Sequence, residues 1–194
     1  MLMRYKKHYL SLIIGILLPM ITSVLANAGY LDLESSDIGE SILTNRSTFS
    51  FTTDSPFTVV KVVDGDTIDI AQNGETIRVR LIGINTPETV DPRRPVECFG
   101  KEASNHAKGL LTGKTVTVET DPSQGMYDKY QRLLAYVVLP DGSSFNKRMI
   151  AEGYAYEYTY DIPYKYQKTF KDAQSIAREK ELGLWSPQTC SGKK

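Results

Sequence analysis

Two neighbouring segments, V-D-G-D-T at residues 63–67 and G-E-T-I-R-V-R-L-I-G-I-N-T-P-E-T at residues 74–89, carry the clearest structural pattern in this chain. The first contains an Asp-Gly-Asp turn signal, and Gly74 at the start of the second forms, with the preceding Asn73, a pair typical of a tight hairpin. From residue 75 to residue 84 the side chains alternate, which predicts a strand with Arg80 opposite its main apolar stripe. Thr86-Pro87 then ends this strand.

The remaining pattern adds further strands and three helices. Strands are expected at 57–63, 67–71, 75–84, 115–119 and 132–139, and helices at about 99–111, 144–152 and 164–181. A tyrosine-rich loop is expected at 154–162. Three strands, a helix, two strands and two helices are typical of the α+β class, and a five-stranded Greek-key barrel with helices to one side is a closure that fits this order.

The N-terminal part of the chain differs from the rest. A basic start precedes an apolar run from residue 10 to residue 26, and Ala26-Asn27-Ala28 fits the pattern of a signal-peptidase site. We expect an export signal at 1–28, with an uncleaved membrane anchor as the alternative because the run is borderline in length. Residues 29–55, rich in Ser, Thr and acidic groups, read as a linker. A folded domain is expected at 56–190 and a short charged tail at 191–194.

Composition and cysteine usage set two further limits. The chain is 41% hydrophobic and 24% charged with zero net charge, so a nucleic-acid-binding surface would need to concentrate its basic residues in one place. Cys98 and Cys190 are its two cysteines. In an oxidising compartment they would form one disulfide, worth about 4–5 kcal/mol in the chain-entropy model. Two unpaired thiols are the alternative.

Polar residues that suit phosphodiester hydrolysis recur at the expected strand ends. Asp66 lies in the Asp-Gly-Asp turn, Asn85 and Glu88 lie just past a strand, and Arg80 and Arg132 lie in strands. If the barrel gathers them, the cleft holds oxygen ligands for a hard cation, two guanidinium groups for a phosphate and a carboxylate for the attacking water. Each motif alone is more often a turn, a solvated face or a strand end.

The order of the motifs resembles the staphylococcal nuclease family from residue 63 to residue 185. The matching segments are V-D-G-D-T (63–67), R-L-I-G-I-N-T-P-E-T (80–89), G-K-E-A-S (100–104), D-K-Y-Q-R-L-L-A-Y (128–136), N-K-R-M-I-A-E-G-Y-A (146–155) and A-R-E-K-E-L-G-L-W (177–185). The resemblance implies an OB-fold five-stranded β-barrel with three α-helices. It also implies a Ca²⁺-dependent nuclease that cuts DNA and RNA with little sequence specificity and leaves 3′-phosphate products.

The resemblance also assigns roles to particular residues. Arg80, Glu88 and Arg132 match the catalytic residues of the family, Asp66 matches a calcium-binding carboxylate, and Thr86 matches the residue whose backbone carbonyl binds calcium.

One position departs from the family. Asn85 stands where the family has a second metal-binding aspartate. An amide oxygen still binds a hard cation, but one negative charge is lost, so weaker calcium binding is expected and the preferred metal stays open.

Substrate contacts are expected on both sides of the catalytic residues. Lys129 and Tyr130 match positions near the terminal phosphate of the substrate, and Tyr156, Tyr158 and Tyr160 lie where the family has base- and sugar-contacting tyrosines, to within one residue. Tyrosines in such a loop also commonly pack on a barrel. Single-stranded DNA and RNA are the favoured substrates, since stacking on tyrosine tolerates any base. A monomer with no obligate protein partner is the default expectation.

Two other functions compete with the enzyme. One is a non-catalytic OB-fold module that binds nucleic acid, and the other is an envelope protein that uses the barrel for protein contacts. The enzyme is favoured because Arg80, Glu88 and Arg132 occur together with Asp66, and a binding module has no need of that combination.

Overall fold

The structure is a computed structural model that describes residues 55–193 with the exception of residue 94. The expected export signal and nearly all of the 29–55 segment lie outside the described residues. Among the described residues, none of the helices has the length and apolar character needed to cross a membrane.

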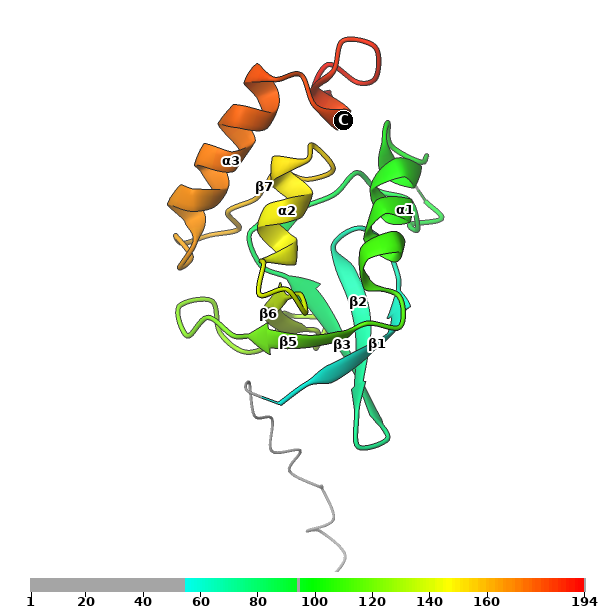
Figure 1. Cartoon of the computed structure of the whole chain (residues 1–194), viewed down its shortest axis with the longest axis vertical. Helices are drawn as coiled ribbons and strands as arrows, with labels where there is room; N and C mark the ends of the chain where they lie inside the picture. The colour runs from blue at the N-terminus through cyan, green and yellow to red at the C-terminus, as the bar shows by residue number, and fades with distance from the viewer. Residues whose placement is uncertain (1–54, 94, 194) are drawn as a thin grey trace, which may run out of the picture. The chain divides into compact units, whose positions relative to one another are not determined.

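Five strands close a barrel in the order β1-β2-β3-β6-β5. These strands are β1 (Phe57–Val62), β2 (Thr67–Gln72), β3 (Glu75–Leu81), β5 (Thr115–Glu119) and β6 (Leu133–Val138). All neighbours are antiparallel except β3 and β6, which pair in parallel. The barrel and its three helices confirm the α+β OB-fold class that the sequence predicts (Figure 1).

The helices lie to one side of the barrel in Figure 1. They are α1 (Gly100–Leu111), α2 (Phe145–Ala151) and α3 (Gln167–Glu179), and a short 3-10 turn, η1 (Gly183–Trp185), follows. The side chain of Ser144 caps α2 by accepting a hydrogen bond from the Lys147 N–H. The expected start of the last helix at residue 164 was wrong, because residues 164–166 precede the helix and place two tyrosines against the core.

A fully buried asparagine ties α2 to the barrel. Asn146 Oδ1 accepts a hydrogen bond from the Val137 N–H at 2.9 Å, and its Nδ2 donates to the Ile82 carbonyl at 2.9 Å. Buried polar groups are costly when unpaired, so this side chain fixes α2 to β6 and to the segment that leaves β3. That segment leads directly into the candidate site.

A second, small sheet brings the tyrosine-rich loop to the same place. Strand β4 (Ile84–Asn85) pairs with β7 (Tyr156–Glu157), and the Tyr158 N–H donates to the Gly83 carbonyl at 3.0 Å. Gly83 has φ +78°, and a Cβ there would lie 2.7 Å from the Tyr164 ring, so only glycine fits. The sequence pattern indicated a loop at 154–162 and did not predict β7.

The C-terminus is joined covalently to the segment before α1. Cys98 and Cys190 form a disulfide, with their Cα atoms 6.0 Å apart and a sequence separation of 92 residues. The bridge connects the chain after η1 with Cys98, which directly follows Glu97. Glu97 in turn forms hydrogen bonds with Glu88.

Candidate active site

The Asp-Gly-Asp turn between β1 and β2 packs against the chain after β4. Asp66 is buried, and its Oδ2 accepts hydrogen bonds from the Thr86 N–H at 2.9 Å and the Thr86 hydroxyl at 3.2 Å. Its Oδ1 accepts a hydrogen bond from the Thr67 hydroxyl at 3.0 Å. A Cβ on Gly65 would lie 2.5 Å from the Thr86 side chain, so the close approach requires glycine. The two expected metal-binding segments are therefore in direct contact.

Arg80 joins this turn to β4. Its Nη2 lies 3.3 Å from Asp66 Oδ2 and 3.4 Å from Asn85 Oδ1. Its Nη1 donates to the carbonyls of Leu81 at 2.6 Å and Ile84 at 2.9 Å. The guanidinium is thus held on several sides, which fixes its direction before any ligand binds.

Asp64 is a further acidic residue at this turn, and the sequence analysis read it only as part of a turn signal. Burial, together with the neighbouring Asp66 carboxylate, raises the pKa of Asp64 to about 7. Its Oδ1 accepts a hydrogen bond from the Asp66 N–H at 3.1 Å. Two carboxylates two residues apart in a loop are a signal that could have identified it.

The chemistry of this donor set fits a hard divalent cation. The Asp64 and Asp66 carboxylates and the Asn85 amide are oxygen ligands, which such a cation prefers, and a positive ion would favour the ionised form of both acids. Among the described residues, no group of three or more Asp, Glu, His or Cys side chains is arranged so that it could hold a metal ion by itself. A bound cation would therefore need amide, backbone or water oxygens as well.

Arg132 enters from the hairpin that leads into β6. Its Nε and Nη2 lie 2.7 Å and 2.6 Å from Asp128 Oδ2, and its N–H donates to Asp128 Oδ1 at 2.9 Å. Its guanidinium carbon also lies 5.3 Å from the centre of the Tyr130 ring. Burial alone would raise the pKa of Asp128, but hydrogen bonds from the backbone and side chain of Arg132 outweigh it, so the pKa lies below its usual range. Sequence reasoning missed Asp128, although an acid four residues before a base is a recognisable pair.

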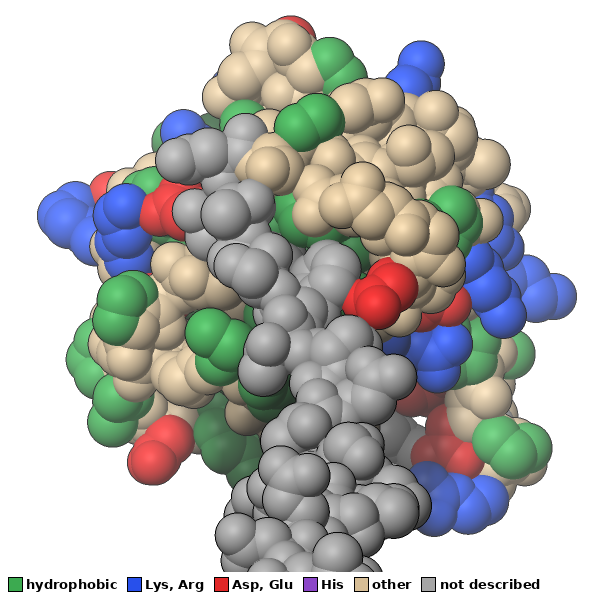
Figure 2. Space-filling model, turned by 90° about the horizontal axis from the view of Figure 1, so that it is seen from below, with side chains coloured by type: hydrophobic (Ala, Val, Ile, Leu, Met, Phe, Trp, Pro, Cys, Tyr) green, Lys and Arg blue, Asp and Glu red, His purple; other side chains and the backbone are tan. Residues whose placement is uncertain are grey.

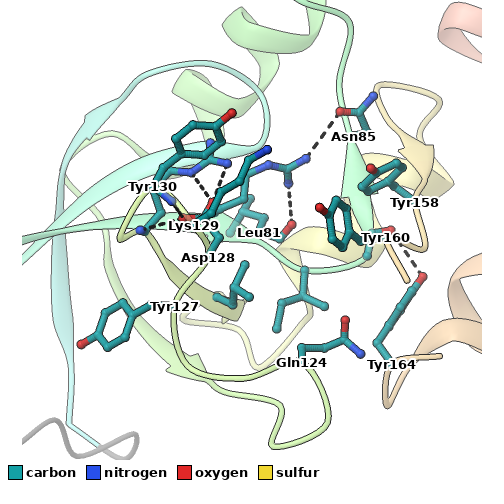
Figure 3. A pocket seen from close by; sticks show the side chains of 15 residues that line it. Leu81, Asn85, Gln124, Tyr127, Asp128, Lys129, Tyr130, Tyr158, Tyr160 and Tyr164 are labelled. Carbon is teal, nitrogen blue, oxygen red and sulfur yellow. Dashed lines mark hydrogen bonds and ion pairs between the residues drawn. The ribbon is translucent and has the colours of Figure 1, made fainter. Parts of the chain in front are cut away.

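A cleft of about 440 Å³ brings most of the predicted substrate contacts together (Figure 3). Residues predicted from the sequence that line it are Arg80, Asn85, Lys129, Tyr130, Arg132, Tyr158 and Tyr160. Gln124, Tyr127, Asp128 and Tyr164 line it too and were not predicted. On the face seen in Figure 2, Lys and Arg side chains stand in separate groups with acidic side chains among them. The residues that line the cleft combine three cations, Arg80, Lys129 and Arg132, with several tyrosine rings.

Four of the predicted residues, Asp66, Thr86, Glu88 and Tyr156, are not among the residues that line this cleft. Asp66 and Thr86 reach it only through Arg80 and Asn85. Glu88 lies in the next loop, where its Oε1 accepts hydrogen bonds from the N–H groups of Val90 at 2.7 Å and Asp91 at 3.0 Å.

Tyr156, from the same tyrosine-rich loop as the cleft residues, also lies elsewhere. It packs against Trp185 with ring centroids 5.2 Å apart, and its hydroxyl donates to the Lys193 carbonyl at 3.3 Å.

An OB-fold barrel with two arginines in one cleft, beside an oxygen-rich acidic turn, defines a protein that can hold a phosphodiester next to a cation. Comparison with known proteins gives the family. The family described as "Staphylococcal nuclease homologue" matches residues 78–187. A thermonuclease of Staphylococcus intermedius is 45% identical over 129 residues, which cover 66% of this chain and 75% of that protein. The chain belongs to the staphylococcal nuclease family.

Two further relatives agree with this. A thermonuclease of Staphylococcus hyicus is 41% identical over 130 residues, covering 67% of this chain and 75% of that protein. Endonuclease YncB of Bacillus subtilis is 36% identical over 130 residues, covering 66% of this chain and 61% of that protein.

Proposed function

We propose that this nuclease is an exported, calcium-dependent phosphodiesterase that cuts DNA and RNA with little sequence specificity and leaves 3′-phosphate products. The observation that carries the proposal is the position of Arg80 and Arg132 in one cleft, with Arg80 in contact with the buried Asp66. The names of the relatives, thermonuclease and endonuclease, support the substrate class.

The metal-binding residues would be Asp66, Asn85 and the backbone carbonyl of Thr86, with Asp64 beside them. A bound cation supplies Lewis-acid polarisation of a phosphoryl oxygen. The position of the cation would be set by Asp66 and Asn85. Asp66 is held by Arg80 and by the backbone N–H of Thr86, and Asn85 is held by Arg80. Calcium is favoured over magnesium because an amide and a backbone carbonyl suit a flexible oxygen shell.

The two arginines would divide the work of stabilising charge. Arg80 holds the non-bridging phosphate oxygens throughout, because its contacts leave it little freedom. Arg132 stabilises the charge that develops in the transition state, once the phosphate competes with Asp128 for its guanidinium.

Glu88 would position or deprotonate the attacking water. Its carboxylate is held by two backbone N–H groups of its own loop, and its backbone is held by Glu97. The Glu88 N–H donates to Glu97 Oε2 at 2.9 Å, and the Glu97 N–H donates to the Glu88 carbonyl at 2.9 Å. The side chain would turn toward the phosphate when substrate binds, as catalytic contacts often tighten only in the complex.

The cleft favours single strands over duplexes. Tyr158 and Tyr160 offer ring faces to unstacked bases, and stacking discriminates little between bases. We propose a monomer without an obligate protein partner, which acts on DNA and RNA alike.

The N-terminal signal supports secretion or release into the periplasm or cell envelope, with attachment by an uncleaved N-terminal segment as the alternative. The Cys98–Cys190 disulfide supports an oxidising compartment, where such bonds persist.

The test is degradation of single-stranded DNA by residues 29–194 with calcium, with calcium plus chelator, and by a Glu88→Gln variant. Glu179→Gln, an exposed acid on α3, is the matched control. We expect the chelator to abolish cutting, Glu88→Gln to reduce it by at least about a hundredfold, and the control to leave it unchanged. If the folded wild type binds DNA but does not cut it, whichever divalent cation is added, the protein is a binding module instead.

A further inference from the structure

Aromatic residues stand at both ends of the cleft. Tyr158, Tyr160 and Tyr164 lie at one end in Figure 3, and Tyr127 lies at the other, with Asp128 and Lys129 between them in this view. The first group comes from the tyrosine-rich loop and the residues that follow it. Tyr127 comes from the hairpin before β6, on a different part of the chain.

The side chain of Tyr127 has no evident structural purpose. It is 49% exposed, and among residues 55–193 it makes no hydrogen bond, ion pair or ring contact with another side chain. The neighbouring Met126 is 53% exposed. By contrast, Tyr136 and Tyr164 are buried and donate hydrogen bonds to Asp121 and Glu157. A large aromatic ring left half in water at the rim of a cleft is typical of a contact surface.

Backbone hydrogen bonds place Tyr127 in the same hairpin as Arg132. Tyr127 pairs with Leu133 in an antiparallel bridge, and the Leu134 N–H donates to the Met126 carbonyl at 2.9 Å. The Asp128 N–H donates to the Arg132 carbonyl at 3.0 Å. Tyr127 and Arg132 therefore belong to one hydrogen-bonded hairpin, and both line the same cleft.

The charge of the cleft identifies the ligand. Arg80, Lys129 and Arg132 line it, and each is a cation suited to a phosphate. A sugar–phosphate backbone with one base on each sugar can place its phosphates against the cations in the middle and bases against the rings at the ends. A single-stranded nucleic acid has that chemistry, and base–tyrosine stacking needs no particular sequence.

We propose that Tyr127 is a stacking subsite for a base of a single-stranded nucleic acid, at the end of the cleft opposite Tyr158 and Tyr160. The subsite rests on the proposed function, since it takes the same strand whose phosphate lies at the two arginines. With the Tyr127 subsite, the cleft binds a longer stretch of nucleic acid than the tyrosine-rich loop and the arginines would bind alone. Bases are then held on both sides of the arginines.

The test measures binding rather than cutting. The full chain is mixed with fluorescent oligothymidylates that lengthen by one nucleotide at a time, in chelator, and the dissociation constants come from anisotropy. The variants are Tyr127→Ala, Tyr127→Phe and, as a matched control on the adjacent exposed side chain, Met126→Ala. Thermal melts establish that each variant is folded.

We expect Tyr127→Ala to match the wild type on the shortest oligonucleotides and to bind roughly 5- to 100-fold more weakly beyond a threshold length, as the loss of one stacked base implies. Tyr127→Phe keeps the ring and should bind like the wild type at every length. An equal loss at all lengths, a Phe variant as weak as the Ala variant, or no binding by the wild type would each overturn the subsite.

Binding and cutting separate the two proposals. If the wild type cuts DNA and Tyr127→Ala binds normally at every length, the subsite fails and the nuclease stands. If the length-dependent loss occurs and the wild type never cuts with any divalent cation, the subsite stands and the proposed function fails.

Discussion

Arg80 and Arg132 face the same cleft but are held by different kinds of structure. The side chain of Arg80 is 14% exposed and contacts Asp66, Asn85 and the backbone carbonyls of Leu81 and Ile84. Arg132 is 26% exposed, and its side chain forms an ion pair with Asp128, four residues earlier in the same hairpin. The first arginine is therefore part of the framework that joins the Asp-Gly-Asp turn to β4, whereas the second belongs to a local, self-contained unit. The difference teaches that two arginines that line one cleft can contribute very differently to the fold.

The largest effect is expected from Arg80→Ala. This change removes the proposed phosphate clamp and also the cation beside the buried Asp66, so activity should fall by at least about a thousandfold and stability by about 2–4 kcal/mol. Urea unfolding and kcat/KM on single-stranded DNA measure the two losses. An inactive variant with wild-type stability would show that Arg80 has no place in the framework.

Arg132→Ala should separate activity from stability. Activity should fall by about a hundredfold to a thousandfold, while stability should change by less than about 1 kcal/mol. The reason is that Asp128 keeps its hydrogen bonds from the backbone N–H groups of Tyr130 and Arg132. The same two measurements apply, and a stability loss equal to that of Arg80→Ala would remove the contrast between the arginines.

Asn85→Asp tests whether the residue in contact with Arg80 binds the cation. A carboxylate at this position of the proposed cation site should tighten calcium binding about tenfold and raise activity at limiting calcium. Calorimetric titration of the wild type and the variant measures the affinity. Equal affinities would mean that Asn85 does not bind the cation. Asn105→Asp, on α1, controls for the added charge.

The smallest expected effect is on the pH dependence of folding stability, through Asp128, the ion-pair partner of Arg132. Because the pKa of Asp128 lies below its usual range, its contribution is present above the unfolded-state value of about 4 and is lost as the pH falls through the folded-state value. Asp128→Asn should therefore cost about 1 kcal/mol at neutral pH and less in acid. Urea unfolding across a pH series measures this, and a cost that stays constant with pH would contradict it.

The sequence predicted the parts of this molecule that depend on local patterns. Alternation from residue 75 to residue 84, the Asn73-Gly74 turn and the spacing of apolar residues gave the barrel strands and the helices to within a few residues. Family resemblance gave Arg80 and Arg132, and the structure places both in one cleft.

Other features depend on contacts between distant parts of the chain, which no local period reveals. Strand β7 is two residues long and exists because β4 lies beside it. Asn146 looks like an ordinary helix residue until its carbonyl and N–H partners are in place. Asp64 reads as a turn residue, and only burial beside Asp66 gives it an altered pKa. Tyr127 carries no motif, since its position at the cleft rim follows from the hairpin register.

The disulfide between Cys98 and Cys190 has a consequence for survival among proteases. Residues 98–190 form a covalent ring that contains α1, β5, β6, α2 and α3, including Arg132 and the tyrosine-rich loop. One proteolytic cut anywhere inside this ring opens it without releasing a piece. A nicked molecule keeps Arg80, Glu88 and Arg132 joined in one covalent unit, and a second cut or a reductant is needed before any part of the ring can diffuse away.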